Sequence, residues 1–263
     1  MNLLQSIILG AVEGITEFLP ISSTAHLMIA AELLNLQQSA FVKSFEIAIQ
    51  LGAVFAVLFL YIRRIIENPK IISKIFAGFI PTAIIGALLY SLIKSHLIGN
   101  FKAMFWSLLI GGIILIAVEI YENRKPTPNI PRSEDDDLNL NKISYLQAFG
   151  IGIVQIIAVI PGVSRSAATI IAGRLFGLSK ADALEFSFLL ALPTIAAAAG
   201  YDALENISIF SQNIPSLTVG FVMSFFTAII AIKFLLSFVK NHSLISFGVY
   251  RIVLALLVLL FVI

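Results

Sequence analysis

The stretch 13-EGITEFLPISSTAH-26 places two glutamates, four hydroxyl residues and a histidine around a proline, in a chain that is otherwise strongly apolar. Of the 263 residues, 59% are hydrophobic and only 12% are charged, whereas soluble domains have about 25% charged residues. This composition is typical of an integral membrane protein. Ionisable groups inside a membrane are costly and usually mark a functional site, so the stretch predicts both a broken membrane helix and a site.

The composition also excludes several functions. The net charge of +2 is too small to indicate a nucleic-acid partner. The chain has no cysteine, which excludes disulfides, thiolate chemistry and cysteine-based metal centres. It has no phosphate-binding loop of the ATPase type, no HExxH helix and no Gly-x-Ser-x-Gly elbow. A standard ATPase, zinc protease or α/β-hydrolase is therefore not expected.

The hydropathy pattern predicts an all-α polytopic membrane protein. A spanning helix needs about 20 mostly apolar residues, and six segments qualify: residues 43–62, 76–94, 103–121, 184–200, 216–239 and 245–263. Two more apolar stretches, 3–34 and 145–173, are interrupted by Pro and Ser-rich sequence. We predict that both are re-entrant helix–break–helix hairpins, since irregular backbone at membrane depth is tolerated only where protein or water covers it.

The two halves of the chain resemble each other. The segment 10-GAVEGITEFLPISS matches 152-GIVQIIAVIPGVSRS, with the glycines 142 and the prolines 141 positions apart. Two weaker matches follow in the same order, 45-FEIAIQLGA with 186-FSFLLALPT at an offset of 141 and 82-TAIIG with 227-TAIIA at 145. The common order and the nearly constant offset predict an internal repeat.

We therefore divide the chain into a first repeat at 1–122, a polar linker at 123–142 and a second repeat at 143–263. Each repeat has one hairpin and three spans, an odd number, so the second repeat is predicted to be inverted in the membrane. The positive-inside rule supports this arrangement. With the loop after the first span inside, eleven Lys and Arg side chains fall on the cytoplasmic side and three (Lys43, Lys94 and Lys102) on the other. Both termini are then external.

The first hairpin carries an acidic pair. Glu13 and Glu17 are four residues apart, so on a helix they share a face with about 5–6 Å between their Cβ atoms. Two carboxylates this close in a low dielectric do not both stay ionised without a neutralising partner. The pair therefore predicts a divalent metal, a shared proton or a cationic side chain.

The rest of this hairpin suits an anion. Pro20 ends the first half-helix, and Ser22, Ser23 or Thr24 can cap the second, whose free N–H groups favour an anionic ligand. His26 falls in the first turn of that second helix.

The second hairpin contains 161-PGVSRSAAT-169 and repeats this order of break and helix. Ser164 can cap the helix, and Arg165 at its start has the planar guanidinium that clamps phosphate or carboxylate. Single hydroxyl residues in membrane helices mostly pack or bond to the backbone. For Ser22, Ser166 and Thr169 this structural role is therefore weighed against a functional one. For Glu13, Glu17, His26 and Arg165 the cost of an ionisable group favours function. Five other charged side chains lie near the ends of spans and are expected to snorkel toward water: Glu46, Glu119, Glu185, Lys233 and Arg251. For Glu185 and Arg251 the alternative is a supporting role next to the site.

At these two hairpins the sequence resembles the undecaprenyl-diphosphatase family of bacteria, the bacitracin-resistance type. The segments 47-IAIQLGAVFAVL and 186-FSFLLALPT extend the resemblance over nearly the whole chain. It implies hydrolysis of undecaprenyl diphosphate in the bacterial cytoplasmic membrane, with a polyprenyl diphosphate lipid as substrate. It also implies a divalent cation, Mg²⁺ or Ca²⁺. A homodimer is one alternative for the oligomeric state, which the sequence leaves open.

The resemblance also implies roles for individual residues. Glu13 and Glu17 match the acidic pair of the family, His26 its histidine and Ser23 the hydroxyl proposed as nucleophile. Glu17, Ser23, His26 and Arg165 are accordingly the expected catalytic residues and Glu13 with Glu17 the expected metal ligands. The expected phosphate-binding residues are Ser22, Thr24, Ser164, Ser166 and Thr169. Ala25 and Ala167 stand where the family usually has glycine, which affects fine geometry but removes no chemical group.

Two alternatives stay open from the residues alone. Inverted repeats with broken helices are also the architecture of secondary transporters, so a flippase for polyprenyl phosphate fits much of the same pattern. A scaffold without a site is disfavoured, because it has no reason to bury Glu, His and Arg together. Attack by Ser23 and attack by a water, with His26 or a glutamate as base, are both compatible with the sequence.

Overall fold

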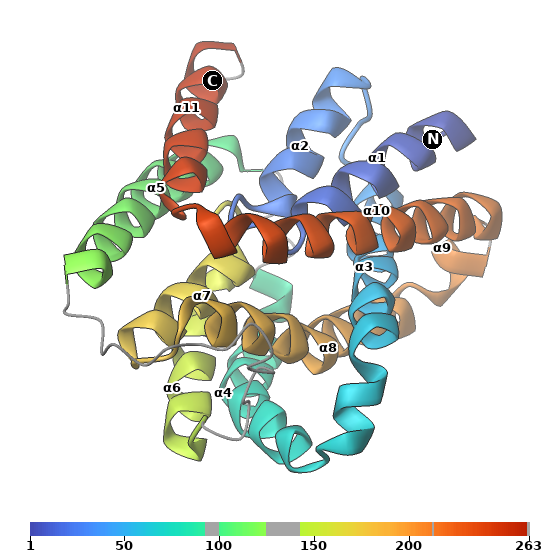
Figure 1. Cartoon of the computed structure of the whole chain (residues 1–263). Coiled ribbons are helices and arrows are strands. Elements are labelled where there is room, and N and C mark those ends of the chain that lie inside the picture. Colours follow the sequence, from blue (N-terminus) through green and yellow to red (C-terminus); the bar gives the residue numbers. More distant parts are fainter. Residues whose placement is uncertain (93–99, 125–142, 212, 262–263) are drawn as a thin grey trace.

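The computed structural model of the chain describes residues 1–92, 100–124, 143–211 and 213–261, and every regular element within these ranges is helical (Figure 1). The elements in chain order are α1 (Leu3–Thr16), α2 (Ser23–Leu33), α3 (Ala40–Glu67), α4 (Lys70–Leu92), α5 (Phe101–Arg124), α6 (Tyr145–Gln155), the 3₁₀ turn η3 (Ile156–Val159), α7 (Arg165–Leu175), α8 (Lys180–Glu205), α9 (Ile207–Ser211), α10 (Ile214–Asn241) and α11 (Ile245–Phe261).

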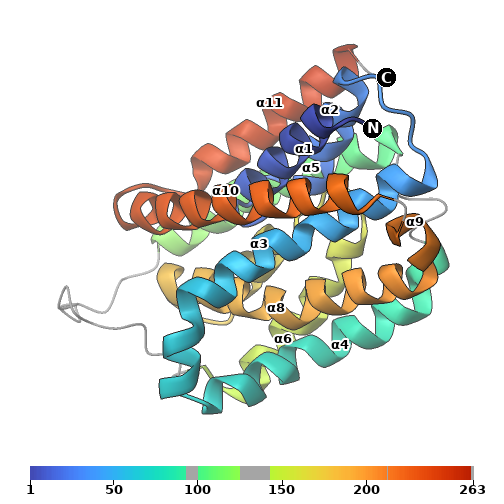
Figure 2. The ribbon, with the colours of Figure 1, turned by 90° about the vertical axis from the view of Figure 1, so that its right-hand side faces the viewer.

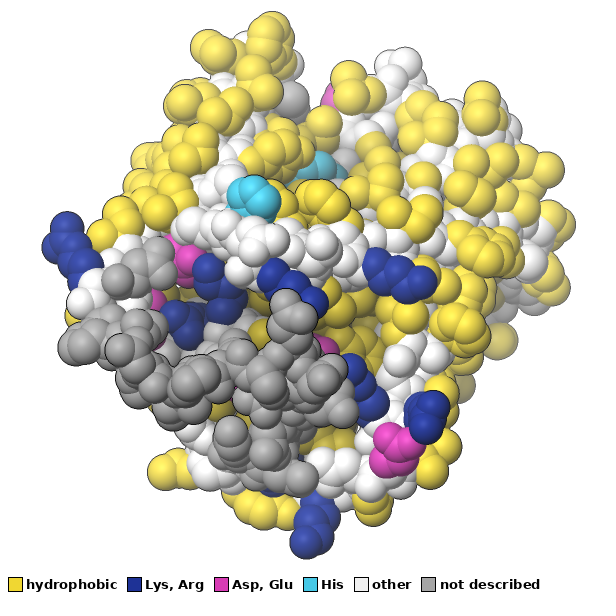
Figure 3. All heavy atoms as spheres, viewed as in Figure 1, with side chains coloured by type: hydrophobic (Ala, Val, Ile, Leu, Met, Phe, Trp, Pro, Cys, Tyr) yellow, Lys and Arg dark blue, Asp and Glu magenta, His cyan; other side chains and the backbone are white. Residues whose placement is uncertain are grey.

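The helices are those of a multi-pass membrane protein. Five of them, α3, α4, α5, α8 and α10, are long and apolar enough to cross a membrane, whereas α11 has 17 described residues. Large hydrophobic side chains in mid-helix, such as Phe59, Ile110 and Ile230, point outward. Figure 3 shows hydrophobic side chains over the upper part of one face and Lys and Arg gathered below them. The all-α polytopic prediction is therefore confirmed, while six crossings with two re-entrant hairpins stays a prediction.

Four long helices form the centre of the fold. They lie side by side in the order α10, α3, α8 and α4 (Figure 2), and each packs against the next. Helix α1 packs on α10 at one side and α6 packs on α4 at the other, while α5 and α11 form a pair of their own. The order is symmetric about the contact between α3 and α8, because α3 and α10 of one side correspond to α8 and α4 of the other.

The two hairpins have the same local structure at positions 142 residues apart. Each begins with a capping box, Asn2 with Gln5 in α1 and Ser144 with Gln147 in α6. The side-chain amide of that glutamine then donates to the carbonyl that follows the second helix of its own hairpin, at Leu34 and Phe176. Asn35 and Gly177, each two positions after the end of its second helix, both have positive φ.

The helix crossings show the same correspondence. A Cβ added to Gly10 of α1 would clash with the backbone of Gly220 in α10, and one added to Gly152 of α6 would clash with that of Gly78 in α4. Glycine is required at both crossings, because only a missing side chain lets the helices approach this closely. Gly78 and Gly220 are also 142 positions apart, so these contacts align α4 with α10 at that offset and not at the 145 of the 82-TAIIG match.

These paired contacts support the predicted repeat. Its boundaries at 122 and 143 and its inversion across the membrane stay predictions. Most of the predicted linker, residues 125–142, lies outside the described residues, as do four of the side chains counted for the orientation: Lys94, Lys125, Arg132 and Lys142.

One end of the molecule is closed by ion pairs between the two halves. Arg64 of α3 pairs with Glu185 of α8 at 3.0 Å, and Lys180 of α8 pairs with Glu119 of α5 at 2.8 Å. Both glutamates are buried, so the expectation that they snorkel toward water is wrong. Each carboxylate is paired with a cationic side chain on a neighbouring helix, and this pairing compensates its charge inside the protein.

Candidate active site

Both hairpins break at a serine with unusual backbone geometry. Ser22 has φ 73° and Ser164 has φ 71°, a left-handed region that non-glycine residues seldom occupy. Each serine caps the helix that follows, since its Oγ accepts from the backbone N–H of Ala25 or Ala167. Such strain persists only where the surrounding structure enforces it, and it is often found at functional sites.

The break of the first hairpin brings Glu17 next to Ser23. The Ser23 hydroxyl donates to Glu17 Oε2 at 2.5 Å, and both side chains are almost fully buried. A hydroxyl group that donates a hydrogen bond to a carboxylate has the geometry of a nucleophile with its general base.

The second hairpin contributes a cation to the same carboxylate. Arg165 donates through Nε and Nη2 to Glu17 Oε1, at 3.3 and 3.1 Å, and through Nη1 to the carbonyl of Ser187 at 2.8 Å. A guanidinium has five N–H groups, and no described residue accepts from the other two. Arg165 is thus fixed in place and still has donors for an anionic ligand.

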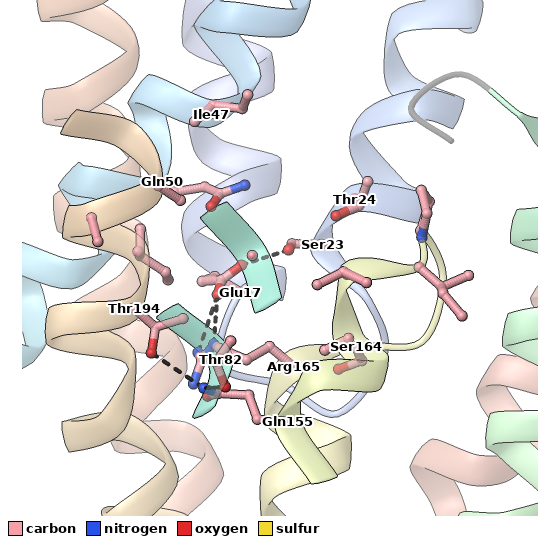
Figure 4. A pocket seen from close by; sticks show the side chains of 18 of the residues that line it. Glu17, Ser23, Thr24, Ile47, Gln50, Thr82, Gln155, Ser164, Arg165 and Thr194 are labelled. Carbon is pink, nitrogen blue, oxygen red and sulfur yellow. Dashed lines mark hydrogen bonds and ion pairs between the residues drawn. The ribbon is translucent and has the colours of Figure 1, made fainter. Parts of the chain in front are cut away.

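These groups line a cavity of about 410 Å³. Six of the predicted site residues border it: Glu17, Ser22, Ser23, Thr24, Ser164 and Arg165. Figure 4 shows Glu17 between Ser23 on one side and Arg165 on the other. The cavity then continues along an apolar wall formed chiefly by α4, η3 and α8, with Phe79, Ala83, Ala87, Ile160, Ala197 and Ala198 among its side chains. A polar end joined to an apolar wall suits an amphipathic ligand.

Glu13 lies one helical turn before Glu17 and does not line the cavity. It is fully buried, and apart from the neighbouring Glu17 carboxyl no described group is close enough to hydrogen-bond with its carboxyl oxygens. A buried acceptor without a partner is costly, and oxygen ligands of this kind suit Mg²⁺ or Ca²⁺. Within the described ranges no cluster of three acidic, His or Cys side chains is close enough to hold a metal, so Glu13 and Glu17 would be the protein's contribution to such a site.

His26 lies behind the break and does not border the cavity. Its Nδ1 contacts the carbonyl of Ser22 and its Nε2 contacts the hydroxyl of Tyr250, both at 2.7 Å. Because a carbonyl only accepts, Nδ1 carries the proton, and Nε2 of the neutral ring accepts from Tyr250. Both ring nitrogens are therefore occupied away from Ser23.

Ser166 and Thr169 are also buried outside the cavity. The Thr169 hydroxyl lies 2.6 Å from that of Ser187 and donates to the carbonyls of Arg165 and Ser166. Arg165 and Thr169 together fasten α7 to Ser187 of α8. The Thr169 hydroxyl thus holds the arginine's helix in place. The buried Ser166 hydroxyl lies 3.5 Å from that of Ser164, and neither Ser166 nor Thr169 borders the cavity.

The sequence prediction missed an amide group in the cavity wall. Gln155 of α6 donates through Nε2 to Thr82 Oγ1 at 2.8 Å and Thr194 Oγ1 at 3.3 Å, and all three line the cavity. Gln155 is 142 positions after Glu13 and falls on it in the match of 10-GAVEG with 152-GIVQI. That alignment was the signal that could have identified it.

The fold and this site define a class of protein: a multi-pass membrane protein with an acid, a hydroxyl and an arginine gathered in an internal cavity between two broken helices. The chain belongs to the family described as bacitracin resistance protein BacA, whose sequence profile matches residues 6–257.

Curated relatives agree with this assignment. The chain is 50% identical to an undecaprenyl-diphosphatase of Aquifex aeolicus, over 96% of this chain and 95% of that protein. Proteins of the same name from Campylobacter fetus subsp. fetus and Persephonella marina are each 46% identical over the full length of both chains.

Proposed function

We propose that this protein hydrolyses undecaprenyl diphosphate to undecaprenyl phosphate and inorganic phosphate. The single observation that carries the proposal is the Glu17 carboxylate, which binds the Ser23 hydroxyl and the Arg165 guanidinium at once. A base, a nucleophile and an anion-binding cation thereby meet in one cavity. The family and the names of the full-length relatives point to the same reaction.

In the proposed first step Ser23 attacks the terminal phosphorus. The bond between Ser23 Oγ and phosphorus forms, the bridging P–O bond breaks, and its electron pair leaves with undecaprenyl phosphate. The serine proton goes to Glu17, whose Oε2 already accepts a hydrogen bond from the Ser23 hydroxyl, with 2.5 Å between the two oxygens. Glu17 passes this proton to the departing lipid phosphate. Water then attacks the phosphorus of the phosphoserine and gives a proton to Glu17, and the bond between Ser23 Oγ and phosphorus breaks. Glu17 returns that proton to Ser23 Oγ as inorganic phosphate leaves.

Charge on the transferring phosphoryl group needs stabilisation. The two N–H groups of Arg165 that bond to no described residue, and the N-terminal ends of α2 and α7, are the protein groups that could supply it. Glu13 and Glu17 are the residues that would hold a divalent cation, and such an ion would supply further positive charge to the site. The buried oxygens of Glu13, which have no partner among the described residues other than the Glu17 carboxyl, support this assignment.

The lipid chain is assigned to the apolar wall of the cavity. This wall reaches toward the beginning of α3, near Lys43, and the end of α8, near Tyr201. The predicted orientation places those helix ends on the external side of the cytoplasmic membrane, together with both termini. The diphosphate would then be hydrolysed at a site open to that side.

The test is phosphate release by the purified protein in detergent. Detergent micelles have no compartments, so a flippase without hydrolytic activity would release no phosphate in this assay. We expect hydrolysis by the parent protein, and its loss in Glu17→Gln and Arg165→Ala. Glu205→Gln, which changes an exposed glutamate at the end of α8, is the matched control and should retain activity. Absence of phosphate release by the parent would favour the transport alternative.

The nucleophile is tested separately. A single turnover in ¹⁸O water with a search for phosphoserine should detect an adduct on Ser23, and Ser23→Ala should abolish it. Direct incorporation of ¹⁸O into the released phosphate by active Ser23→Ala would show that water attacks instead.

A further inference from the structure

The short helix α11 reaches both hairpin breaks through two consecutive residues, Tyr250 and Arg251. Arg251 is fully buried, so the expectation that it snorkels toward the cytoplasmic side is wrong. A buried guanidinium inside a membrane protein is costly unless its donors are satisfied. Its partners therefore indicate what it is for.

Arg251 binds four backbone carbonyls. Nη1 donates to Pro20 at 3.3 Å and Val163 at 3.0 Å, and Nη2 donates to Gly162 at 2.9 Å and Ser107 at 3.0 Å. Pro20 belongs to the break of the first hairpin, and Gly162 and Val163 belong to that of the second. Carbonyls at such breaks have no helical partner, and the membrane interior offers no water in exchange. The Arg251 side chain thus gives hydrogen bonds to carbonyl groups of both breaks and links the two hairpins.

Tyr250 extends the contact to the residue before Ser23. Its hydroxyl binds His26 Nε2, the two rings stack with centroids 5.6 Å apart, and His26 Nδ1 donates to the carbonyl of Ser22. Ser22 is the residue with positive φ from which α2 begins. The orientation of Ser23 is thereby tied to α11.

We propose that Tyr250 and Arg251 form a brace that fixes the two hairpin breaks relative to each other and so positions Ser23 and Glu17 against Arg165. Neither residue lines the cavity, so both are positioning residues. His26 belongs to the same brace in this assignment. The inference rests on the proposed hydrolysis for its kinetic test, and a second measurement below does not depend on it.

Gly111 provides a way to disturb the brace without removing any part of it. A methyl group at Gly111 would clash with Nη2 of Arg251, whereas one at Gly200, also in a helix, would meet nothing within 4 Å. Gly111→Ala is therefore the test variant and Gly200→Ala its matched control. Misplacement of reacting groups by about 1 Å can cost on the order of 100-fold in rate. We expect kcat to fall 10- to 100-fold in Gly111→Ala, with KM within about twofold of the parent, and no change in Gly200→Ala.

A double variant shows whether Gly111 acts through the arginine. Arg251→Met removes the guanidinium with which the methyl would clash, so Gly111→Ala should add little to its loss of kcat. Additive losses would mean that Gly111→Ala perturbs packing independently, and would count against the proposal. If Arg251→Met does not fold, Tyr250→Phe tests the brace in its place. This variant keeps the ring stack but removes the hydrogen bond to His26. We expect its kcat to fall while the shape of the pH–rate profile stays that of the parent.

The activity-independent measurement uses the absence of cysteine in the chain. Spin labels on cysteines at Leu33 and Leu175, both exposed at the ends of α2 and α7, report the distance between the hairpins. We expect a narrow distribution in the parent and Gly200→Ala, and a broadened or shifted one in Gly111→Ala and Arg251→Met. If the parent protein has no hydrolytic activity but the distance distributions differ among the variants as expected, the proposed function is refuted while the brace is supported.

The brace is overturned by either of two results. One is that Gly111→Ala and Arg251→Met keep the kcat and the label distances of the parent. The other is that they lower only the melting temperature, with kcat per folded molecule, KM and distances unchanged, which would make Arg251 a stabilising residue alone.

Discussion

The two hairpins share a backbone but not a chemistry. Both have a capping box, a capping serine with positive φ and a glycine crossing at positions 142 apart. At the positions that face the cavity, however, the first hairpin has Ser23 where the second has Arg165. A second difference is that Glu13 of the first hairpin, which lies outside the cavity, corresponds to Gln155 of the second, which lines it.

This difference shows how a duplicated scaffold yields a two-sided site. The repeated backbone brings the two breaks together, and the side chains that differ supply opposite charges to the same place. The acid and the hydroxyl come from one hairpin and the cation from the other, so neither hairpin is a site alone. The comparison predicts that changes to the cavity residues are unequal between hairpins, while changes to the backbone positions are equal.

The largest effect is expected at the charge that only the second hairpin has. Arg165→Lys keeps the charge but cannot bind Glu17 twice and Ser187 as well, so kcat should fall by about 100-fold or more. Arg63→Lys, at a side chain that is 89% exposed, is the control and should leave kcat unchanged. Steady-state kinetics on the lipid substrate measure both, and full activity in Arg165→Lys would contradict the clamp.

The next effect concerns Glu13 and Gln155, which correspond to each other. Glu13→Gln should raise the divalent cation concentration needed for half-maximal activity by about 10-fold, because it removes one of two carboxylates assigned to the metal. Gln155→Asn shortens the amide at the corresponding position and should leave this cation dependence unchanged. Titration of activity with Mg²⁺ distinguishes the two, and an equal shift in both variants would argue against a metal on the acidic side only.

At the helix crossings the two hairpins should behave alike. Gly10→Ala and Gly152→Ala each force a methyl group against a facing glycine backbone, and such overpacking costs about 1–3 kcal/mol. Thermal unfolding in detergent should show similar losses for the two variants and none of this size for Gly200→Ala. A large loss in one variant alone would break the structural equivalence of the hairpins.

The smallest effect is expected at the caps. Ser22→Ala and Ser164→Ala each remove an N-cap hydrogen bond, which is worth about 1 kcal/mol of stability. Ser22→Gly and Ser164→Gly should cost less, since glycine adopts positive φ without strain. Melting temperatures of the four variants test the order, and a glycine variant less stable than its alanine counterpart would contradict it.

Local signals in the sequence were sufficient for the broken helices. Apolar stretches interrupted by Pro and Ser predicted both hairpins, and six of the predicted site residues line one cavity. The missed residues depend on contacts between distant parts of the chain. Arg251 was expected to snorkel because hydropathy gives depth along a helix but not the direction of a side chain, and its partner Pro20 is 231 residues away. His26 and Tyr250 are separated by 224 residues.

The glycine crossings also set an order for assembly during synthesis. Gly10 of the first hairpin packs on Gly220, in the half of the chain that is made last, and Gly152 of the second packs on Gly78. At about 5–20 residues per second, the 210 residues between Gly10 and Gly220 take on the order of 10–40 s to emerge. For that time the first hairpin can pack against α3 but lacks α10, its main docking partner, whereas the second hairpin finds α4 already made. The hairpin with Ser23 and Glu17 is therefore the last to be fixed in place.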